Sequence, residues 1–550
     1  MFFKLDFLPN NKGFKKAFAL SVIMLTLIFP ALVSAQEYSA VTGIVTDSGG
    51  AVIPGVKVTL LDTKTAKELT TTTNNQGVYT FNNVLPGEGY KLSFTAQNFQ
   101  TLNLNAVKLG VAQTETQNVQ LSPGQVSETV DITSTSGDAT LNTTDASIGN
   151  VIGKRQLREL PIQFRGNPAS LLSLQPGVVG NNVGTGAANR VGSVTGSRAD
   201  QGNITIDGID SNDQASQQAF QTVGNLPIDS VQEFRAVSTN PGASDGRSSG
   251  GQIQISTQPG TNDFHGSLRE YTRTEKTAAN TFFNNRNGIA RPRLRRNQFG
   301  GSIGGPLPFF NFGEGGPMFR SGKDKLFFFF DYEGRRDRSQ ATQAITVPLN
   351  HFRNGSIGYI NNNAGCTFTS RLDTTPNCIS FVTPAQIAAL DPQGVGNSAA
   401  LMSFVQSRYP VANDTSGGNG INTGLFRFNT PVTRDENTYT TRIDYNLNKD
   451  QRLFGRTTIT RRNSVNSIAL FPGDAPAQGF QDKSYQWVVG HSWNITSTLF
   501  NQATVGVSNQ IFAFPPTASP AFPNSFTFGG GITSPYPSQS FQDRDVFTPT

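Results

Sequence analysis

Alternation of apolar and polar positions is the dominant pattern along this chain, and it predicts strands over most of its length. Between Tyr38 and Leu121 the expected strands are short and evenly spaced, with turn sequences such as Asn74-Asn75-Gln76-Gly77 between them. After residue 260 they become long, and connections of unequal length separate them. The first pattern predicts a small β-sandwich and the second a barrel-type sheet.

The clearest long alternation runs from Tyr439 to Leu447. Aromatic and aliphatic residues occupy one face with Thr441, and polar or charged residues such as Arg442 and Asp444 occupy the other. The short turn Asn448-Lys449-Asp450 then leads into a second alternating run. A polar row opposite an apolar row is typical of a strand with a lumen on one side and lipid on the other.

Residues 145–259 predict a mixed α/β unit instead. Short helices are expected at residues 153–160 and 168–174, each ending before a proline or Pro-Gly pair, and strands at residues 204–206 and 231–237. The Asp207-Gly208 pair that follows the first of these strands predicts a tight turn.

The first 35 residues have the pattern of a signal peptide. Lysines end at Lys16, an apolar stretch runs from Ala17 to Phe29, and Val33-Ser34-Ala35 supplies small residues for cleavage after Ala35. No later segment approaches 18 continuous apolar residues, so a membrane-spanning form of the exported protein must be a barrel.

The stretch from Gly246 to Gly305 joins the mixed unit to the long strands. Its Ser249-Gly250-Gly251-Gln252-Ile253 segment, together with Leu160-Pro161 and Ile206-Asp207-Gly208, resembles the plug-to-barrel junction of TonB-dependent outer-membrane receptors. The closest resemblance is to the Oar-like branch, which carries an extra N-terminal domain. The resemblance implies a plug inside the barrel, with Asp207, Gly208, Gly250 and Gly251 as its motif residues.

The N-terminal strands resemble a carboxypeptidase-regulatory-like domain, through Thr42 to Asp47, Asn75 to Tyr79 and Leu85-Pro86-Gly87. This segment contains no histidine, and a zinc peptidase needs clustered His and Glu ligands. The expected fold is therefore mainly β. Its parts are a signal peptide (1–35), a sandwich (36–122), a linker (123–144), a mixed α/β plug (145–259) and the N-terminal part of a transmembrane antiparallel β-barrel (260–550).

A seven-residue segment in the linker resembles a TonB box, which implies a TonB-type energy-transducing protein as partner. An exposed β-prone heptapeptide can add a strand to a partner's sheet. Two alternatives remain open for it, the last strand of the sandwich or plain linker. The candidate residues are Glu128, Thr129, Val130, Asp131, Ile132, Thr133 and Ser134.

Candidate chemistry outside these motifs is sparse. The three histidines are isolated in sequence, and no nucleophile elbow, phosphate loop or zinc motif occurs, so we expect no catalysis, cofactor or bound metal. Cys366 and Cys378, the two cysteines, are a candidate disulfide in a polar loop. Asp207, Asp210 and Asp213 lack the spacing of a calcium loop, and a polar turn is favoured there.

Charge does not indicate nucleic acid. The signal peptide holds half of the formal net charge of +6. The one basic cluster lies without aromatic interleaving, so a solvated loop or contact with anionic lipopolysaccharide is favoured over nucleic-acid binding. Its residues are Arg286, Arg291, Arg293, Arg295 and Arg296.

These patterns predict an energy-coupled receptor in the outer membrane, in contact with its lipid and with the N-terminal domain in the periplasm. The substrate is open among siderophore, glycan, peptide and protein. The alternative is a surface adhesion or scaffold protein without transport. Because receptors of this type close with about 22 strands, we expect the chain to lack about half of its barrel.

Overall fold

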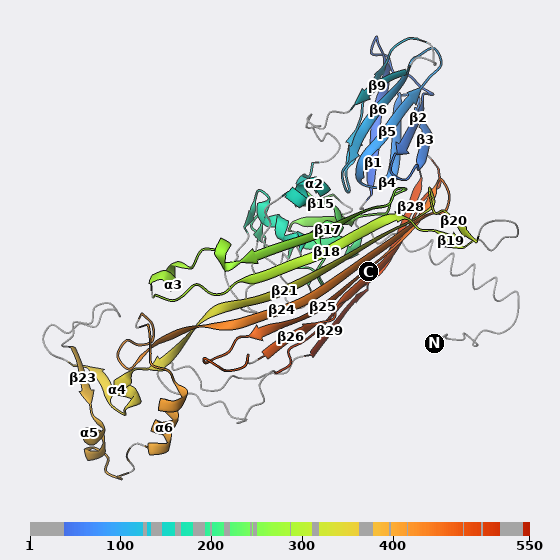
Figure 1. Ribbon diagram of the computed structural model, residues 1–550. Helices are drawn as coiled ribbons and strands as arrows, with labels where there is room; N and C mark the ends of the chain where they lie inside the picture. The colour runs from blue at the N-terminus through green and yellow to red at the C-terminus, as the bar shows by residue number, and fades with distance from the viewer. Residues whose placement is uncertain are drawn as a thin grey trace, which may run out of the picture.

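The computed structural model describes residues 38–124, 129–133, 146–159, 167–179, 193–197, 201–213, 221–242, 245, 250–286, 288–310, 318–361, 378–394, 396, 398–414, 416–476, 478–496, 499–516 and 543–549. Three parts follow one another along the chain: a sandwich, a small mixed unit and one large curved sheet (Figure 1). The expected signal peptide, residues 1–35, lies outside the described residues. No helix in the described part is long and apolar enough to cross a membrane.

Two packed sheets form the sandwich. One has the order β4-β1-β7, with β8 also paired to β1, and the other has the order β3-β2-β5-β6-β9. Val58, Leu60 and Phe94 are fully buried between them. The sandwich predicted from short alternating strands is therefore confirmed. Its strands are β1 (Ser39–Asp47), β2 (Lys57–Asp62), β3 (Glu68–Thr72), β4 (Val78–Val84), β5 (Gly87–Thr95), β6 (Thr101–Leu109), β7 (Thr114–Thr116), β8 (Val119–Leu121) and β9 (Thr129–Thr133).

The mixed unit has a five-stranded sheet of order β10-β15-β16-β13-β14. Ile204, Phe234 and Ile255 lie in its core, where Leu157 and Leu171 from the two predicted helices also pack. Both helices are present, the second as a 3-10 helix. The elements are β10 (Ile148–Gly153), α2 (Lys154–Glu159), η1 (Pro168–Leu174), β11 (Val178–Val179), β12 (Ser193–Val194), β13 (Asn203–Ile206), β14 (Ile209–Asp210), η3 (Ile228–Ser230), β15 (Val231–Thr239) and β16 (Gln252–Thr257).

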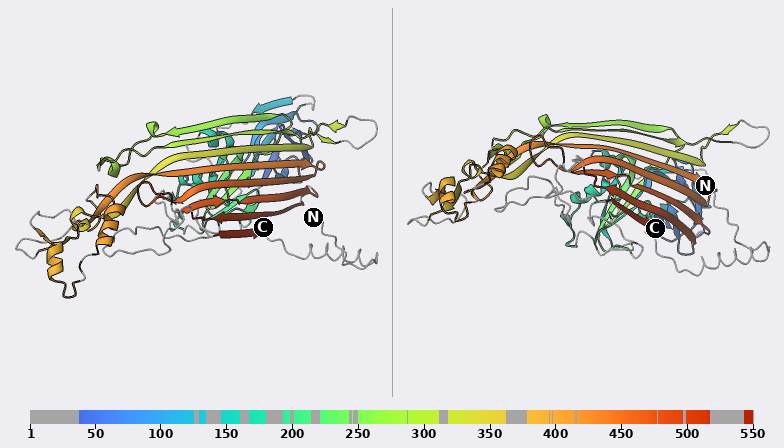
Figure 2. Two further views of the ribbon diagram at one scale, coloured as in Figure 1. Left: turned by 60° about the horizontal axis from the view of Figure 1, so that its bottom comes forward. Right: turned by 90° about the horizontal axis from the view of Figure 1, so that it is seen from below.

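Long antiparallel strands form the third part, a sheet bent into a trough whose concave side faces the mixed unit (Figure 2). The tight β24–β25 and β27–β28 turns lie at the end nearest the sandwich, together with the longer connection between β18 and β21, and the long connection between β21 and β24 lies at the opposite end (Figure 1). The strands are β17 (His265–Thr274), β18 (Arg295–Pro306), β21 (Leu326–Pro348), β24 (Thr423–Asn446), β25 (Gln451–Ser467), β26 (Gln478–Asp482), β27 (Tyr485–Asn494), β28 (Phe500–Ala513) and β29 (Asp543–Pro549).

Exposure along β24 follows the alternation predicted from the sequence. Tyr439, Ile443 and Tyr445 on the convex face are 39–42% exposed, whereas Arg442 and Asp444 on the concave face are buried. β21 departs from this pattern, because its Phe327 and Phe329 are also buried on the concave side. Phe327 lies against Gly260, where the mixed unit joins the sheet. Contact where the mixed unit joins the sheet thus explains a strand that is apolar on both faces.

Both ends of the polar stretch at residues 340–430 are built into the sheet. β21 continues to Pro348 and β24 already begins at Thr423, since residues 341–348 pair with residues 423–430. Short elements fill the remainder, and Tyr409 packs on Phe471 there with ring centroids 5.2 Å apart. These elements are α4 (Asn350–Arg353), β22 (Ile357–Ile360), β23 (Ile379–Val382), α5 (Pro384–Ala389) and α6 (Ala399–Arg408).

Other short elements lie in the connections between the strands of the large sheet. They are η5 (Glu275–Thr277), α3 (Phe282–Arg286), β19 (Phe309–Phe310) and β20 (Phe319–Arg320).

Two arginines of the predicted basic cluster make contacts within the protein. Arg291 donates to the carbonyl of Ala278, and Arg296 pairs with Asp337 at 3.1 Å. Arg295 and Arg296 lie in β18 and not in a loop, so the solvated-loop interpretation is wrong for these two residues.

Gly43 in β1 offers a test of the sandwich packing. A Cβ added there would lie 1.9 Å from the backbone oxygen of Gln117, so Gly43→Ala should destabilise the sandwich by about 1–3 kcal/mol. Gly49→Ala is the matched control, since its added Cβ meets only a side-chain oxygen of Asp47 at 3.3 Å. Urea unfolding of both variants measures the difference, and equal stabilities would contradict the packing described.

Candidate functional site

The predicted Asp207-Gly208 turn lies at the centre of the contact between the mixed unit and the large sheet. Both residues have positive φ, +49° and +83°, as a two-residue hairpin turn between β13 and β14 requires. Asp207 is buried with 4% of its surface exposed. Its carboxylate accepts hydrogen bonds from the amide of Thr257 at 2.9 Å and from the Thr257 hydroxyl at 2.7 Å.

Two arginines of the large sheet reach the same carboxylate. Arg442 of β24 lies 3.0 Å from Oδ1, and Arg456 of β25 lies 2.7 Å from Oδ2. Arg456 also donates to the carbonyl of Ile206, and Arg442 is shared with Asp444, which pairs with Arg452 as well. A buried charge is tolerated only when paired and hydrogen-bonded, so this cluster fixes how the unit lies against the sheet.

A second ion-pair cluster lies at Arg269 of β17. Its guanidinium contacts Asp331 of β21 at 2.7 Å and Asp229 of the mixed unit at 3.2 Å. Ser230 donates to the same Asp331 at 2.6 Å. The side chains of these three charged residues are at most 6% exposed. The mixed unit is therefore attached to the concave face at two separate buried charge clusters.

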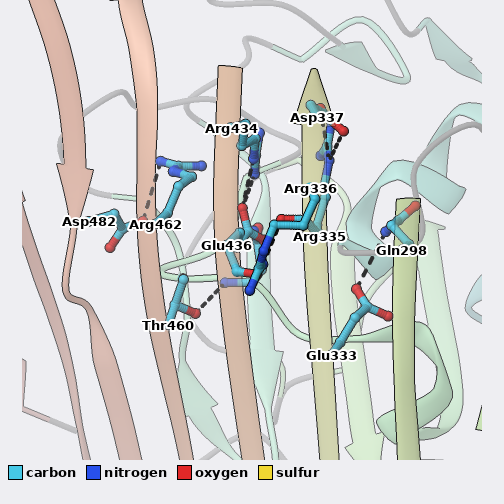
Figure 3. Close-up of polar contacts among 12 residues, drawn as sticks. Gln298, Glu333, Arg335, Arg336, Asp337, Arg434, Glu436, Thr460, Arg462 and Asp482 are labelled. Atoms are coloured by element: carbon cyan, nitrogen blue, oxygen red, sulfur yellow. Dashed lines mark hydrogen bonds and ion pairs between the residues drawn. The ribbon is translucent and has the colours of Figure 1, made fainter. Parts of the chain in front are cut away.

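Further along the concave face, charges of alternating sign cross four neighbouring strands (Figure 3). Arg335 pairs with Asp337, Arg434 with Glu436, and Arg462 with Asp482. Asn225 of the mixed unit joins this belt, since its side chain donates to Glu436 and its amide donates to the Thr460 hydroxyl at 3.1 Å. The loop at Asn225 therefore contacts the belt directly.

Apolar contact adds to these polar ones. Ile209, directly after the Asp207-Gly208 turn, packs against Phe454 and Val488 of the sheet. Gln486 donates to the Ser211 hydroxyl, and Ser508 donates to the carbonyl of Asp210. Asp210 itself accepts from the amide and side chain of Asn212. Among the described residues, no group of three or more His, Cys, Asp or Glu side chains is arranged to hold a metal.

The other two predicted motif glycines, Gly250 and Gly251, serve close packing inside the mixed unit. A Cβ on Gly250 would lie 2.3 Å from the carbonyl oxygen of Gln201, and one on Gly251 would lie 2.7 Å from Val194. Both of these close approaches are to residues of the mixed unit itself. The two glycines therefore serve the interior of the unit, on the approach to β16.

The candidate TonB box occupies the edge of the sandwich. β9 pairs in parallel with β6, with Thr101 opposite Thr129 and Asn105 opposite Thr133. Asn103 donates to Asp131 at 2.9 Å, and this hydrogen bond lowers the pKa of the Asp131 carboxyl. Val130 and Ile132 are 40% and 46% exposed. Glu128 and Ser134, the ends of the candidate segment, lie outside the described residues.

The sandwich rests on the mixed unit through one pair of side chains from β15. Glu233 accepts a hydrogen bond from the amide of Val111 at 2.6 Å, and Arg235 donates to the carbonyl of Ala112. Both side chains are buried, and a cavity of about 300 Å³ lies beside Glu233. Sequence reasoning missed this contact, because only the charged alternation along residues 231–237 hinted at it.

Cys378 is disulfide-bonded. The other cysteine, Cys366, lies outside the described residues. The predicted pairing of Cys366 with Cys378 would close a segment of the long connection between β21 and β24.

Burial raises the pKa of Glu233 from its ordinary 4.5 to about 7. Lys108, Glu88 and Arg235 are the charged groups that modulate this pKa. A carboxyl whose pKa is raised by docking favours the docked state most below pH 4.5, and this contribution is lost as the pH rises to about 7. The amide of Val111 should therefore show weaker hydrogen-exchange protection at about pH 8 than at about pH 5, after correction for intrinsic rates.

The variant Glu233→Gln provides the control for that measurement. Its amide oxygen still accepts from Val111 but does not titrate, so the protection of Val111 should become independent of pH. A pH dependence that persists in this variant would assign the effect to another group.

Arg456→Met tests the buried cluster at Asp207. Removing one partner of a buried ion pair is strongly destabilising, and because Arg442 remains we expect a loss of about 3 kcal/mol. Arg461→Met is the control on the same strand, since Arg461 is exposed and donates to backbone carbonyls. Thermal unfolding of the detergent-solubilised protein should separate the two variants, and equal losses would contradict a special role for Arg456.

Comparison with known proteins agrees with this architecture. Residues 256–548, more than half of the chain, match the family described as outer membrane beta barrel domain, and residues 40–122 match the carboxypeptidase regulatory-like domain. The TonB-dependent transporter Oar of Myxococcus xanthus is 24% identical over 341 residues, which are 59% of this chain and 29% of that protein.

Solved outer-membrane receptors are also similar in part. The ferric enterobactin receptor PfeA of Pseudomonas aeruginosa, as a point mutant in complex with enterobactin, matches with a TM-score of 0.40 at 10% identity over 72% of this chain and 45% of its own. The transporter YddB of Escherichia coli gives 0.40 at 12% identity, over 66% and 39%. This chain spans less than half the length of each of these relatives. By its family match, the chain belongs to the outer-membrane β-barrel family, and it is similar in part to an Oar-type TonB-dependent transporter.

Proposed function

We propose that this chain is the plug-bearing part of a receptor that binds a substrate on the outer side and moves it across the outer membrane with energy from the inner membrane. The observation that carries the proposal is the plug attached to the concave face of the sheet by buried charges. A plug that lies on the lumen face blocks passage until it shifts. Transport therefore requires a force that displaces it.

The orientation follows from the connections. Outer-membrane barrels have short periplasmic turns and long extracellular connections. The tight turns lie at the sandwich end, where Asn83 of the sandwich contacts Asn494. The sandwich and the candidate TonB box thus face the periplasm. The segment with α4, α5 and α6 faces the outside of the cell.

The partner in this proposal is a TonB-type energy-transducing protein that binds at residues 128–134. Val130 and Ile132 are exposed there in an extended strand, which suits addition of a partner strand. The outward segment binds the substrate in this proposal. The substrate can be a siderophore, a glycan, a peptide or a protein. Oar-like resemblance leaves the direction of transport open.

The adhesion alternative rests on the outward segment, which is folded and carries exposed apolar side chains such as Tyr359 and Phe381. An adhesin would use that surface without moving anything. Energy dependence separates the two functions, because adhesion is indifferent to the proton gradient.

The experiment compares culture medium from native cells with medium from cells lacking the gene, by untargeted mass spectrometry of small molecules and proteins. Val130→Pro removes a main-chain donor from β9, so it should abolish the gene-dependent change in the medium while leaving receptor levels intact. Dissipating the proton gradient should give the same loss. Gln125→Pro, next to Gly124, is the matched control, because it places a proline in the linker outside β9.

A gene-dependent change that survives both Val130→Pro and loss of the gradient would contradict the coupled-transport proposal. Cell attachment that depends on the gene, without any change in the medium, would favour adhesion instead.

A further inference from the structure

β9 lies at the edge of the sandwich and belongs to the same sheet as the strand that leads to the plug. It pairs with β6 over five residues, in parallel, so both strands run in the same direction. Along its other edge, no ladder partner occurs among the described residues. A partner strand can therefore add to β9 while β9 stays paired with β6.

β6 ends at Leu109, and the turn that follows contains the residues that contact the plug. Leu109 and Val111 are fully buried. Ala112 has a φ of +51°, and the turn contacts β15 through Val111 and Ala112. The strand paired with the candidate TonB box thus leads directly into the contact between sandwich and plug.

Glu233 and Arg235 hold that turn by its backbone. Glu233 accepts from the amide of Val111 and Arg235 donates to the carbonyl of Ala112, and these two side chains project from the same face of β15. Arg235 is also anchored within the plug by Ser147 at 3.0 Å. The guanidinium of Arg235 stays charged, and a hydrogen bond from a charged donor is stronger than one between neutral groups, so this contact can carry load.

β15 in turn is a central strand of the plug sheet. Its antiparallel neighbour is β16, and Thr257 at the end of β16 donates to Asp207. A displacement of β15 therefore acts, one strand away, on the buried ion pairs of Asp207 with Arg442 and Arg456. A short series of contacts therefore connects β9 with the ion pairs of Asp207: β9 with β6, the 110–113 turn with β15, and β16 with Asp207.

We propose that Glu233 and Arg235 are positioning residues for force transfer: a pull on β9 reaches the plug through β6 and the 110–113 turn, with β9 still paired to the sandwich. This inference rests on the proposed energy coupling. The competing route is the direct covalent one, in which β9 leaves β6 and residues 134–147 draw on β10.

A disulfide between β9 and β6 distinguishes the two routes. Asn103 and Asp131 are ladder partners whose side chains already touch, and neighbouring strands about 4.8 Å apart suit a disulfide. In the native cell, the double variant Asn103→Cys with Asp131→Cys should keep the gene-dependent change in the medium within about 2-fold of its reduced form. A loss of about 10-fold or more that reductant restores would overturn the proposal.

A second variant pair tests the contact with the plug. Glu233→Ala removes the acceptor for the Val111 amide, and we expect the transport rate to fall at least about 10-fold with receptor levels in the outer membrane unchanged. Glu233→Gln keeps an acceptor oxygen and should restore transport to within about 2-fold. A fully active Glu233→Ala variant at normal levels would overturn the proposal.

If Glu233→Ala lowers receptor levels, a longer linker between β9 and β10 distinguishes force transfer through the sandwich from the covalent route. About six Gly/Ser residues inserted between Asp138 and Ala139 add slack to the covalent route only, so transport should stay within about 2-fold. Loss that grows with insertion length would overturn force transfer through the sandwich. Failure of the coupling itself is recognised separately, because Val130→Pro would then be as active as the wild type.

Discussion

The buried carboxylate of Asp207 is the constraint on which the arrangement of this protein depends. An ionised group removed from water is tolerated only when opposite charges and hydrogen bonds surround it. Here Arg442 and Arg456 come from two strands of the sheet, and the Thr257 donors come from the plug. The Asp207 carboxylate needs donors from both parts, so the plug and the sheet specify each other's position.

A single carboxylate cannot hold a unit of this size at one angle. The cluster at Arg269 supplies a second point, and the belt that Asn225 joins supplies a third. The three points lie at different heights along the concave face, from the turn end toward the outward segment. Such spacing resists tilting, whereas removal of the plug requires all three polar contacts to give way.

Sequence patterns predicted the sandwich, the alternating wall and the Asp207-Gly208 turn, because each depends on local periodicity or turn chemistry. The alternation at Tyr439 to Leu447 placed Arg442 on the inner face correctly. It could not pair Arg442 with Asp207, since such pairing depends on how two separately folded parts dock. The parallel pairing of β9 with β6 was left open for a related reason: edge strands of five residues have few neighbours to specify them, and Glu233 gave no signal beyond its own charge.

The shared arginines also bear on how such receptors diversify. A plug transplanted into another barrel would bring Asp207 without the two strands that neutralise it. A barrel given a foreign plug would leave Arg456 without the Asp207 carboxylate, while Arg442 would keep only Asp444. Recombination between receptor genes should therefore be productive when the crossover keeps residues 203–257 with β24 and β25, and unproductive when it falls between them. The segment between β21 and β24 lies outside this restriction, so it can change while the plug and the strands that neutralise Asp207 are inherited as one block.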